Sequence, residues 1–439
     1  MRREKIFRGF LVFLLFFLFF YPQGILAQGE SEVEKELKEI KERLKELEQE
    51  KIEVTDEDGH RLHPVRSLYG ATISGGLTAI LQGSLNNKER FGGDHSEASI
   101  SADLILEYGF GEESNVLFRL DWAPADGLGN LPPLLVNPNG NPSGPNADIE
   151  GLTTLHLVEA RYEHRLLDEA ILIAFGQMDL TSYFDSNHYA NSERNQFLAQ
   201  QFVNNTAIEW GGDENFLGPG VVLGLNSSER VGVLVGFFEG DGNYKDFFDN
   251  PFLIGQLSIQ TQTGGRDGNV RLYGWGRLTD HCNSASDLSI FSDCTLILPA
   301  DQNKRQDQNT GFGFSLDQQV SGGIGVWSRF GYQDPDVSQF EFAVSGGAGF
   351  SGEMIGRPDD ELGVAYGASF PSGPYELATG FNDVEHYGEL YYRMVPFGDG
   401  RRPEIQISPD IQIIANPGGD RSVDPVLIWG FRTQVNFYW

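Results

Sequence analysis

Cysteine, basic residues and long hydrophobic runs are all scarce in this 439-residue chain. It has two cysteines, and its 32 basic residues stand against 63 acidic ones, for a formal net charge of −31. Such a surplus of acid argues against nucleic acid and anionic lipid surfaces as partners. The one pronounced hydrophobic run, Phe10–Tyr21, is shorter than the roughly 20 apolar residues of a transmembrane helix. Any residence in a membrane must therefore depend on β-strands.

Catalytic sequence motifs are missing as well. The chain has no glycine-rich phosphate loop followed by lysine, no Gly-x-Ser-x-Gly elbow and no His-Glu-x-x-His helix. The pair Asp359–Asp360 resembles paired catalytic carboxylates, but acidic pairs are common in exposed turns. We therefore expect neither an enzyme nor a cofactor.

The N-terminus predicts export. Four basic residues (Arg2, Arg3, Lys5 and Arg8) precede the hydrophobic run, and Ile25-Leu26-Ala27 follows it. This order is typical of a signal peptide, 1–27, and the run is too short for the alternative of a membrane anchor. Removing these residues, with four basic and one acidic side chain, changes the net charge from −31 to −34.

The two cysteines, Cys282 and Cys294, are twelve positions apart. In an exported protein this spacing predicts a disulfide that closes a loop. A zinc site is the alternative because His281 is adjacent, but no second pair of ligands is spaced to complete a tetrahedron.

Residues 28–55 predict a coiled-coil helix. Apolar side chains recur with heptad spacing between charged ones, at Val33, Leu37, Ile40, Leu44, Leu47 and Val54. A lone solvated helix is the alternative, but a helix this short would be marginal by itself. The pattern therefore favours an oligomer. Residues 56–69 form a polar linker, in which His60 and His63 are interpreted as solvated rather than as metal ligands.

Residues 70–439 predict an all-β fold, a 16-stranded antiparallel transmembrane β-barrel. The last strand, Val426–Trp439, alternates apolar and polar side chains with period 2, as expected with lipid on one face and water on the other. The expected strands are Ala71–Gly83, Ser96–Phe110, Asn115–Ala123, Thr153–Arg165, Ala170–Asp179, Gly218–Asn226, Arg230–Glu239, Phe252–Gln262, Asn269–Leu278, Gly311–Gln319, Gly323–Gln333, Phe340–Phe350, Leu362–Phe370, Glu385–Val395, Glu404–Ala415 and Val426–Trp439.

The connections between these strands alternate in length. Short turns such as Gly111–Ser114 alternate with long connections at 124–152, 180–217 and 279–310. Barrels of the outer membrane have short periplasmic turns and long outer loops, so both chain ends and the coiled coil are predicted to be periplasmic. A soluble β-sandwich is the alternative, but the polar face of Glu404–Ala415 does not suit a dry core.

The connection Leu180–Leu217 mixes aromatic, amide and charged side chains. We expect it to fold into the barrel and narrow it, whereas packing outside on its neighbours is the alternative. The predicted loop contacts to a solute are Asp185, Asn187, Asn191, Arg194 and Asn204. The predicted lumen side chains are Arg119, Asp121, Glu159, Arg161, Arg271, Trp275, Arg329 and Arg393. Trp275 and Tyr273 could instead face lipid in an aromatic girdle.

The run Gly176–Trp210 resembles the signature of the carbohydrate-selective porin family, the OprB type. The matching residues are Gly176, Asp179, Phe184, Asp185, Asn187, Ala190, Asn191, Gln196, Phe197, Leu198, Asn204 and Asn205. Later pieces are similar and in the same order: Ser328–Tyr332, Arg357–Gly367, Glu389–Arg393 and Ser408–Gly419. The resemblance implies a bacterial outer-membrane porin that passes sugars and other small hydrophilic solutes by facilitated diffusion.

The same resemblance implies the partners. These are outer-membrane lipid, a homotrimer and the barrel-assembly machinery, which would read the aromatic C-terminal strand. Two alternatives stay open. The net charge of −34 favours a general or cation-preferring porin, and the coiled coil favours an envelope-spacing structural protein with incidental permeability.

Overall fold

The structure is a computed structural model, and it describes residues 71–85, 93–111, 113–130, 134–140, 155–167, 169–212, 216–228, 230–240, 248–282, 306–396 and 403–438. The predicted signal peptide (1–27), coiled coil (28–55) and linker (56–69) lie outside these residues, as do Cys294 and Trp439. The disulfide and these domain boundaries therefore remain predictions. The barrel belongs to one compact unit, Val65–Trp439.

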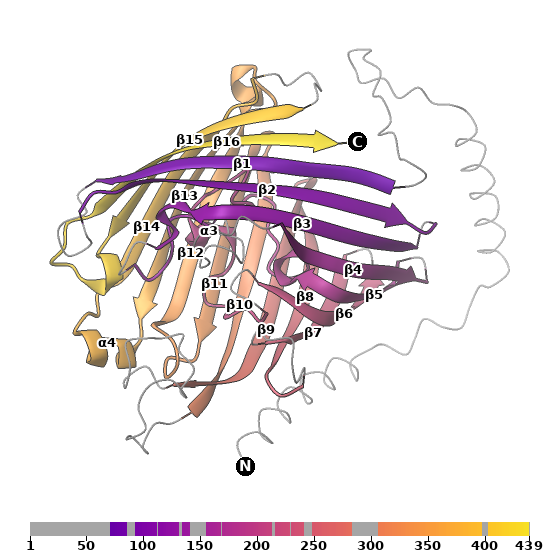
Figure 1. Cartoon of the computed structure of the whole chain (residues 1–439), viewed down its shortest axis with the longest axis horizontal. Helices are drawn as coiled ribbons and strands as arrows, with labels where there is room; N and C mark the ends of the chain where they lie inside the picture. The colour runs from indigo at the N-terminus through magenta and orange to yellow at the C-terminus, as the bar shows by residue number, and fades with distance from the viewer. Residues whose placement is uncertain are drawn as a thin grey trace. The chain divides into compact units, whose positions relative to one another are not determined.

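The described residues form sixteen antiparallel strands in a closed barrel (Figure 1). Each strand pairs with its neighbours in sequence, and β1 closes the ring by pairing with β16. The strands are β1 (Ala71–Leu85), β2 (Ser96–Gly109), β3 (Ser114–Asp126), β4 (His156–Leu166), β5 (Ile171–Asp179), β6 (Leu217–Ser228), β7 (Val231–Glu239), β8 (Pro251–Thr263), β9 (Arg266–Cys282), β10 (Gln306–Ser321), β11 (Ile324–Gln333), β12 (Phe340–Ser351), β13 (Glu361–Pro371), β14 (Glu385–Arg393), β15 (Glu404–Ala415) and β16 (Val426–Tyr438).

This fold confirms the predicted strand number, strand order and closure. Ser74 opposes Tyr438, and Leu85 opposes Leu427, so the first and last strands pair along nearly their whole length. The largest differences lie between β9 and β10: β9 ends at Cys282 rather than Leu278, and β10 begins at Gln306 rather than Gly311. At its other end β9 begins at Arg266 and β8 ends at Thr263, so that Gly264 and Gly265 alone make the turn. Both glycines have positive φ (61° and 77°), as a tight hairpin turn between twisted strands requires.

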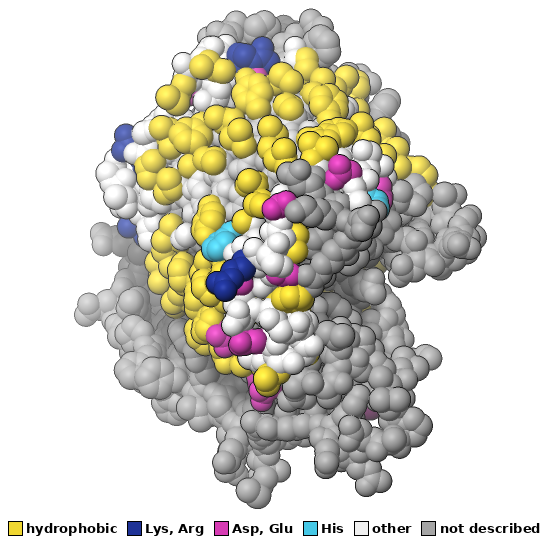
Figure 2. Space-filling model, turned by 90° about the vertical axis from the view of Figure 1, so that its left-hand side faces the viewer, with side chains coloured by type: hydrophobic (Ala, Val, Ile, Leu, Met, Phe, Trp, Pro, Cys, Tyr) yellow, Lys and Arg dark blue, Asp and Glu magenta, His cyan; other side chains and the backbone are white. Residues whose placement is uncertain are grey.

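Alternation along each strand separates an apolar outer face from a polar inner face. On β15, Ile411 and Ile413 are 53% and 51% exposed, whereas Gln412 between them is 1% exposed. Figure 2 shows, on one face of the molecule, that hydrophobic side chains (yellow) cover much of the described outer surface. Polar side chains turned inward and apolar ones turned outward are the reverse of a β-sandwich, and they match a barrel surrounded by lipid.

The two ends of the barrel differ. The turns that follow even-numbered strands are mostly short, as at 110–113 and Gly264–Gly265, and both β1 and β16 have their free ends on this side. We call it the short-turn end. The opposite side, the long-loop end, carries the connections 127–155, 180–216 and 283–305. This asymmetry agrees with the predicted orientation, in which the short turns are periplasmic.

Two of the long connections also fill part of the interior. Residues of 180–212 and 134–140 pack against inward-facing side chains of the barrel and form two buried apolar clusters with them. Four short helical segments complete the connections: η2 (Gly127–Asn130), η3 (Leu180–Ser182), α3 (Gln200–Val203) and α4 (Gly373–Thr379). Two further single turns, η4 (Gly352–Ile355) and η5 (Pro417–Gly419), follow β12 and β15. Among the described residues, no helix has the length and hydropathy needed to cross a membrane.

Candidate functional site

The connection between β5 and β6 folds into the barrel, and we call residues 180–216 the inner loop. Its aromatic side chains are sequestered: Phe184 and Phe202 are fully buried, and Phe197 is 1% exposed. Phe197 packs edge-to-face on Tyr391 of β14, and the ring centroids are 4.9 Å apart. α3, within the inner loop, lies against β12 and β13 (Figure 1). The apolar content of the loop thus explains its position, because in the outer loops these rings would be exposed to water.

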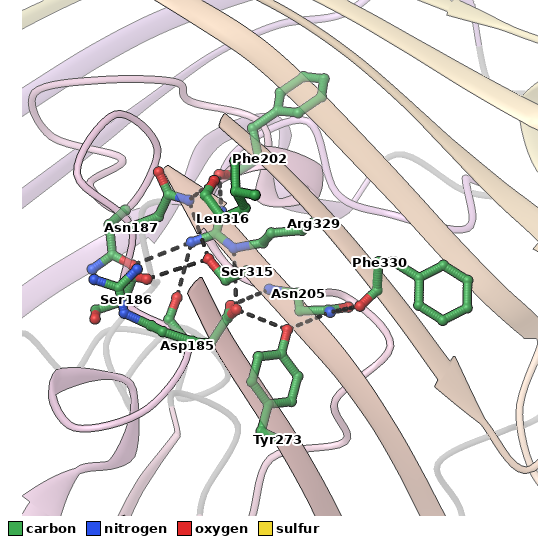
Figure 3. A network of polar contacts seen from close by, with 12 residues as sticks. Asp185, Ser186, Asn187, Phe202, Asn205, Tyr273, Ser315, Leu316, Arg329 and Phe330 are labelled. Carbon is green, nitrogen blue, oxygen red and sulfur yellow. Dashed lines mark hydrogen bonds and ion pairs between the residues drawn. The ribbon is translucent and has the colours of Figure 1, made fainter. Parts of the chain in front are cut away.

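Asp185 is the centre of the polar network that holds the inner loop (Figure 3). Its carboxylate accepts hydrogen bonds from the backbone N–H of Asn205 (2.6 Å), from Tyr273 Oη of β9 (2.9 Å) and from Arg329 Nε of β11 (3.2 Å). Asp185 has a positive φ of 57°, a conformation that aspartate tolerates better than most residues. Asp185 therefore shapes the backbone at its own position, and its carboxylate links the Asn205 segment of the loop to Tyr273 and Arg329 of the wall.

Two buried arginines of the wall bind the loop through its carbonyl groups. Arg329 donates to the carbonyls of Phe202 (2.9 Å) and Asp185 (3.0 Å). Arg432 of β16 donates to the carbonyls of Glu193 and, at 2.7 Å, of Gln196. Since a loop cannot satisfy its own carbonyls as a helix does, these guanidinium groups replace the water that the interior excludes.

Buried carboxylates on β14 do the same for backbone N–H groups. Glu389 accepts from Leu198 (2.5 Å) and Ala199 (2.9 Å) of the inner loop. Glu385 accepts from Leu135 (2.9 Å), in the connection after β3, and from Gly418 (2.5 Å). Sequence reasoning missed Arg432, Glu385 and Glu389. Their inward register could have marked them as interior residues, but not as partners of loop backbone.

The connection after β3 supplies a second inner segment, Leu134–Gly140, which the sequence did not predict. The Pro138 carbonyl accepts hydrogen bonds from Gln412 (2.9 Å) and Gln82 (3.3 Å) of the wall. The N–H of Gly140 donates to Leu198 of the inner loop at 2.7 Å. Apolar side chains such as Leu134 and Val136 were the available signal, because they pack in the interior cluster.

The other predicted loop residues take several positions. The Asn187 amide donates to Ser315 and Leu316 of β10, at 3.1 Å each. Arg194 forms an ion pair with Asp103 of β2. The Asn191 side chain accepts from Arg329 at 3.4 Å, whereas the Asn204 amide nitrogen is buried without a hydrogen-bond partner. The Asp185 and Arg329 side chains are 0% and 1% exposed, so they are placed to hold the loop rather than to meet a solute.

The wall formed by β3, β4 and β5 carries a charge ladder, a row of charged side chains that stays partly open. Arg119 lies 2.9 Å from both Asp121 and Glu159, and 3.5 Å from Asp179. Arg161 lies 3.1 Å from Glu159 and 3.5 Å from Glu163. The Arg119 and Arg161 side chains are 17% and 16% exposed. The predicted lumen residues Arg119, Asp121, Glu159 and Arg161 are thus brought together here.

The remaining predicted lumen residues lie elsewhere on the inward face. Arg271 pairs with Asp317 at 2.6 Å, and Arg393 pairs with Glu361 at 3.1 Å near the short-turn end. Trp275 faces inward, which excludes the lipid-facing girdle, but it is 4% exposed and packs in a cluster with Phe252. Its indole is therefore covered in this arrangement, and a sugar ring could not stack on it.

These contacts divide the interior by function. The inner loop and residues 134–140 cover inward side chains of β5–β16, whereas the ion pairs on β3 and β4 stay at a partly exposed surface. The described residues contain no group of three or more histidine, cysteine, aspartate or glutamate side chains placed to bind a metal ion. A wall of paired, partly hydrated charges suits weak contacts with polar solutes.

Comparison with known proteins identifies the class and then the family. The profile of the carbohydrate-selective porin, OprB family matches residues 135–437. The OprB structure of Pseudomonas putida at high pH has a TM-score of 0.65 at 16% identity, covering 84% of this chain and 94% of that chain. Its low-pH structure has a TM-score of 0.50 at 13% identity, covering 84% and 93%. At these identities the two structures support the fold alone.

A curated relative adds a short match. An uncharacterized protein of Aquifex aeolicus (strain VF5) is 41% identical over 66 residues, which are 15% of this chain. The match spans about a fifth, 20%, of the length of that relative.

Together with the family profile, the closed barrel and its polar interior define an outer-membrane β-barrel channel. Since the family profile matches more than half of the residues, this chain belongs to the carbohydrate-selective porin, OprB family. The family resemblance seen in the sequence and the outer-membrane barrel are both confirmed.

Proposed function

We propose that this porin lets sugars and other small hydrophilic solutes diffuse passively across the outer membrane, along the β3–β5 wall. The observation that carries the proposal is the charge ladder from Asp121 and Arg119 to Glu163, which remains partly exposed beside the inner loop. Alternating donors and acceptors match the hydroxyl groups of a sugar, which both donate and accept. Pairing within the ladder keeps each contact weak, so that a solute can leave as well as bind.

The inner loop supports this proposal by setting the width of the passage. Tyr183 of the loop lies beside the ladder: its hydroxyl donates to Glu163, and Arg161 lies 5.4 Å from its ring centroid. The loop thus brings an aromatic face to the charged wall. Sugars are bound by this combination, in which ring C–H groups meet the aromatic face and hydroxyls meet the charged groups.

The experiment is block of single-channel ion current by neutral sugars in planar bilayers, with Arg161→Met as the variant. A hydrogen bond to a charged group contributes about 1.5–3 kcal/mol, so the dissociation constant of the sugar should rise about tenfold or more. Arg421→Met is the matched control, because Arg421 is 81% exposed and, among the described residues, its ion-pair partner is Asp383 at 3.7 Å. The proposal would be overturned if sugars blocked the ion current of the wild type and of Arg161→Met equally. It would also be overturned if sugars blocked the current of neither the wild type nor the variants.

A cation-preferring porin is the second candidate, and the formal net charge of −31 favours it. The two candidates are compatible in one pore, because a field that attracts cations does not exclude neutral sugars. The wider assembly is also proposed. The heptad pattern supports a homotrimer joined through residues 28–55. The aromatic residues at the end of the last strand support its recognition by the barrel-assembly machinery. The same segment supports an envelope-spacing role as a further alternative.

A further inference from the structure

A polar cavity of about 320 Å³ opens at the short-turn end of β1–β4. Its lining includes Thr72, Glu107, Glu113, Asn115, Glu163 and Arg165. The volume lies at the lower end of the range of about 300–1,000 Å³ that is typical of small-molecule sites. A single sugar unit is therefore a more suitable occupant than a long chain.

The strand register places the lining side chains on the inward face of the barrel, so the cavity faces the lumen. Glu107 has the same parity on β2 as the buried Asp103, and its neighbours Leu106 and Tyr108 are exposed on the outer face. Thr72 opposes Glu107 across β1 and β2, and Asn115 opposes Glu163 across β3 and β4. Four neighbouring strands thus contribute inward side chains to one place.

The cavity has hydrogen-bonding groups that the described residues leave unused. The Asn115 side-chain oxygen is buried and has no hydrogen-bond partner. Glu107 and Glu113 lie in the same lining, and no ion pair to either carboxylate occurs among the described residues. Arg165 supplies a guanidinium that is 45% exposed and lies 3.8 Å from Glu169 and 3.9 Å from Glu163. A ligand rich in donors, with some acceptors for Arg165, would satisfy this set.

Glu163 makes the cavity continuous with the charge ladder. The same side chain lines the cavity, lies 3.5 Å from Arg161 and accepts the Tyr183 hydroxyl. On β4 the inward side chains Glu159, Arg161, Glu163 and Arg165 alternate in sign toward the short-turn end. A solute that follows the ladder therefore reaches the cavity before it leaves the barrel.

We propose that this cavity is a release-side subsite for monosaccharide units that carry no acidic group. The proposal rests on the proposed function, and it adds a second site and a charge preference. Three carboxylates face one guanidinium in the lining, so a carboxylate or phosphate on the sugar meets net repulsion. Hydroxyl and ammonium groups meet acceptors.

The test compares glucose, glucosamine and glucuronate by fluctuation analysis of single-channel current, with each solute added on the short-turn side. The wild type should bind glucosamine at least about tenfold more tightly than glucuronate, with glucose between them. The double variant Glu107→Gln and Glu113→Gln should reduce that ratio to about twofold or less. The isosteric amides keep the shape of the cavity and remove the charge.

The matched control is Asp267→Asn. Asp267 also stands at the short-turn end, on β9, where the one side-chain contact of its carboxylate among the described residues is a long one, 3.4 Å, from Gln262. This variant should keep the wild-type ratio. A ratio near one in the wild type, or the same fall in the control and in the double variant, would refute the charge preference.

A second variant tests the cavity itself. Asn115→Leu places an apolar group of similar size at the unpaired oxygen, and it should weaken glucose binding from the short-turn side severalfold with little effect from the long-loop side. If both sides respond alike, the separate subsite is wrong. If Arg161→Met still weakens sugar block while all cavity variants behave as wild type, the proposed function stands without this subsite.

Discussion

At the scale of single residues, the structure gives two kinds of role to one kind of side chain. Arg329 and Arg432 are charged and buried, and each binds carbonyl groups of the inner loop. Arg119 and Arg161 are equally charged but keep partial exposure beside carboxylates. All four have the same inward register on their strands. Which arginines anchor a loop and which meet water is decided by where the loop lies.

Asp185→Asn should free the inner loop from the wall. The substitution leaves Arg329 buried without its carboxylate, which typically costs about 3–5 kcal/mol. We expect a lower midpoint in urea unfolding from lipid vesicles, together with larger and noisier single-channel conductance. Adding Arg329→Met should restore part of the stability, because no unpaired charge remains. Unchanged conductance and midpoint in the single variant would show that this pair does not hold the loop.

At the scale of elements, strands and loop follow different physical rules. A strand needs only alternation, and β15 shows it plainly: polar Gln406, Ser408 and Gln412 are buried and turned inward, while Ile411 and Ile413 face outward. The inner loop has no such period. It is held by specific contacts, including the pair of N–H groups that donate to Glu389 and the Tyr189 ring, which lies over Gly325. An added Cβ at Gly325 would stand 1.8 Å from that ring, so only glycine leaves room for it.

Glu389→Gln should make the inner loop accessible to trypsin. Arg194 is the one tryptic site of 180–216, and in the wild type it lies inside the barrel in an ion pair with Asp103. A glutamine amide can accept at one oxygen only, so Leu198 or Ala199 loses its partner. Mass spectrometry of the fragments should show cleavage after Arg194 in the variant well before the wild type. Asp267→Asn should resist cleavage as the wild type does, and equal resistance of Glu389→Gln would contradict the anchoring role.

At the scale of the whole molecule, closure and charge are the governing features. Pairing of β1 with β16 leaves the barrel without a free sheet edge, which a membrane would not tolerate. The net charge of −31 gives the pore mouths a negative field that acts at long range, unlike the paired charges of the ladder. Neutral solutes are insensitive to this field and small ions are not.

The channel should therefore prefer potassium to chloride in dilute salt. In a salt gradient across a planar bilayer, the reversal potential should have the sign of cation selectivity near 0.1 M. The preference should shrink near 1 M, where the screening length falls from about 10 Å to about 3 Å. A permeability ratio of one or less at both concentrations would refute the long-range field. A ratio that does not change with salt would place selectivity in the narrow ladder instead.

The sequence was most informative where one rule repeats. Period 2 located nearly every strand and put Arg271, Tyr273 and Trp275 on one face of β9, and the structure shows that this face is turned inward. The family motif marked Asp185 and Asn187 as important, but their contacts to Tyr273, Arg329 and Ser315 join residues that are 88 to 144 positions apart. No local pattern reports such pairs. The segment 134–140 escaped prediction because it has neither period nor motif.

The sequence by itself determined that this protein is a closed barrel with a lipid face, a polar interior and an acidic surface, because alternation and net charge are local or additive properties. Only the tertiary structure decided which inward residues remain open. The inner loop buries its own Asp185, covers Arg329 and Trp275 of the wall, and leaves Arg119 and Arg161 beside the passage. The physical reason is that a side chain within the barrel is exposed or buried according to which distant segment packs against it, and that choice is made by contacts across the whole chain.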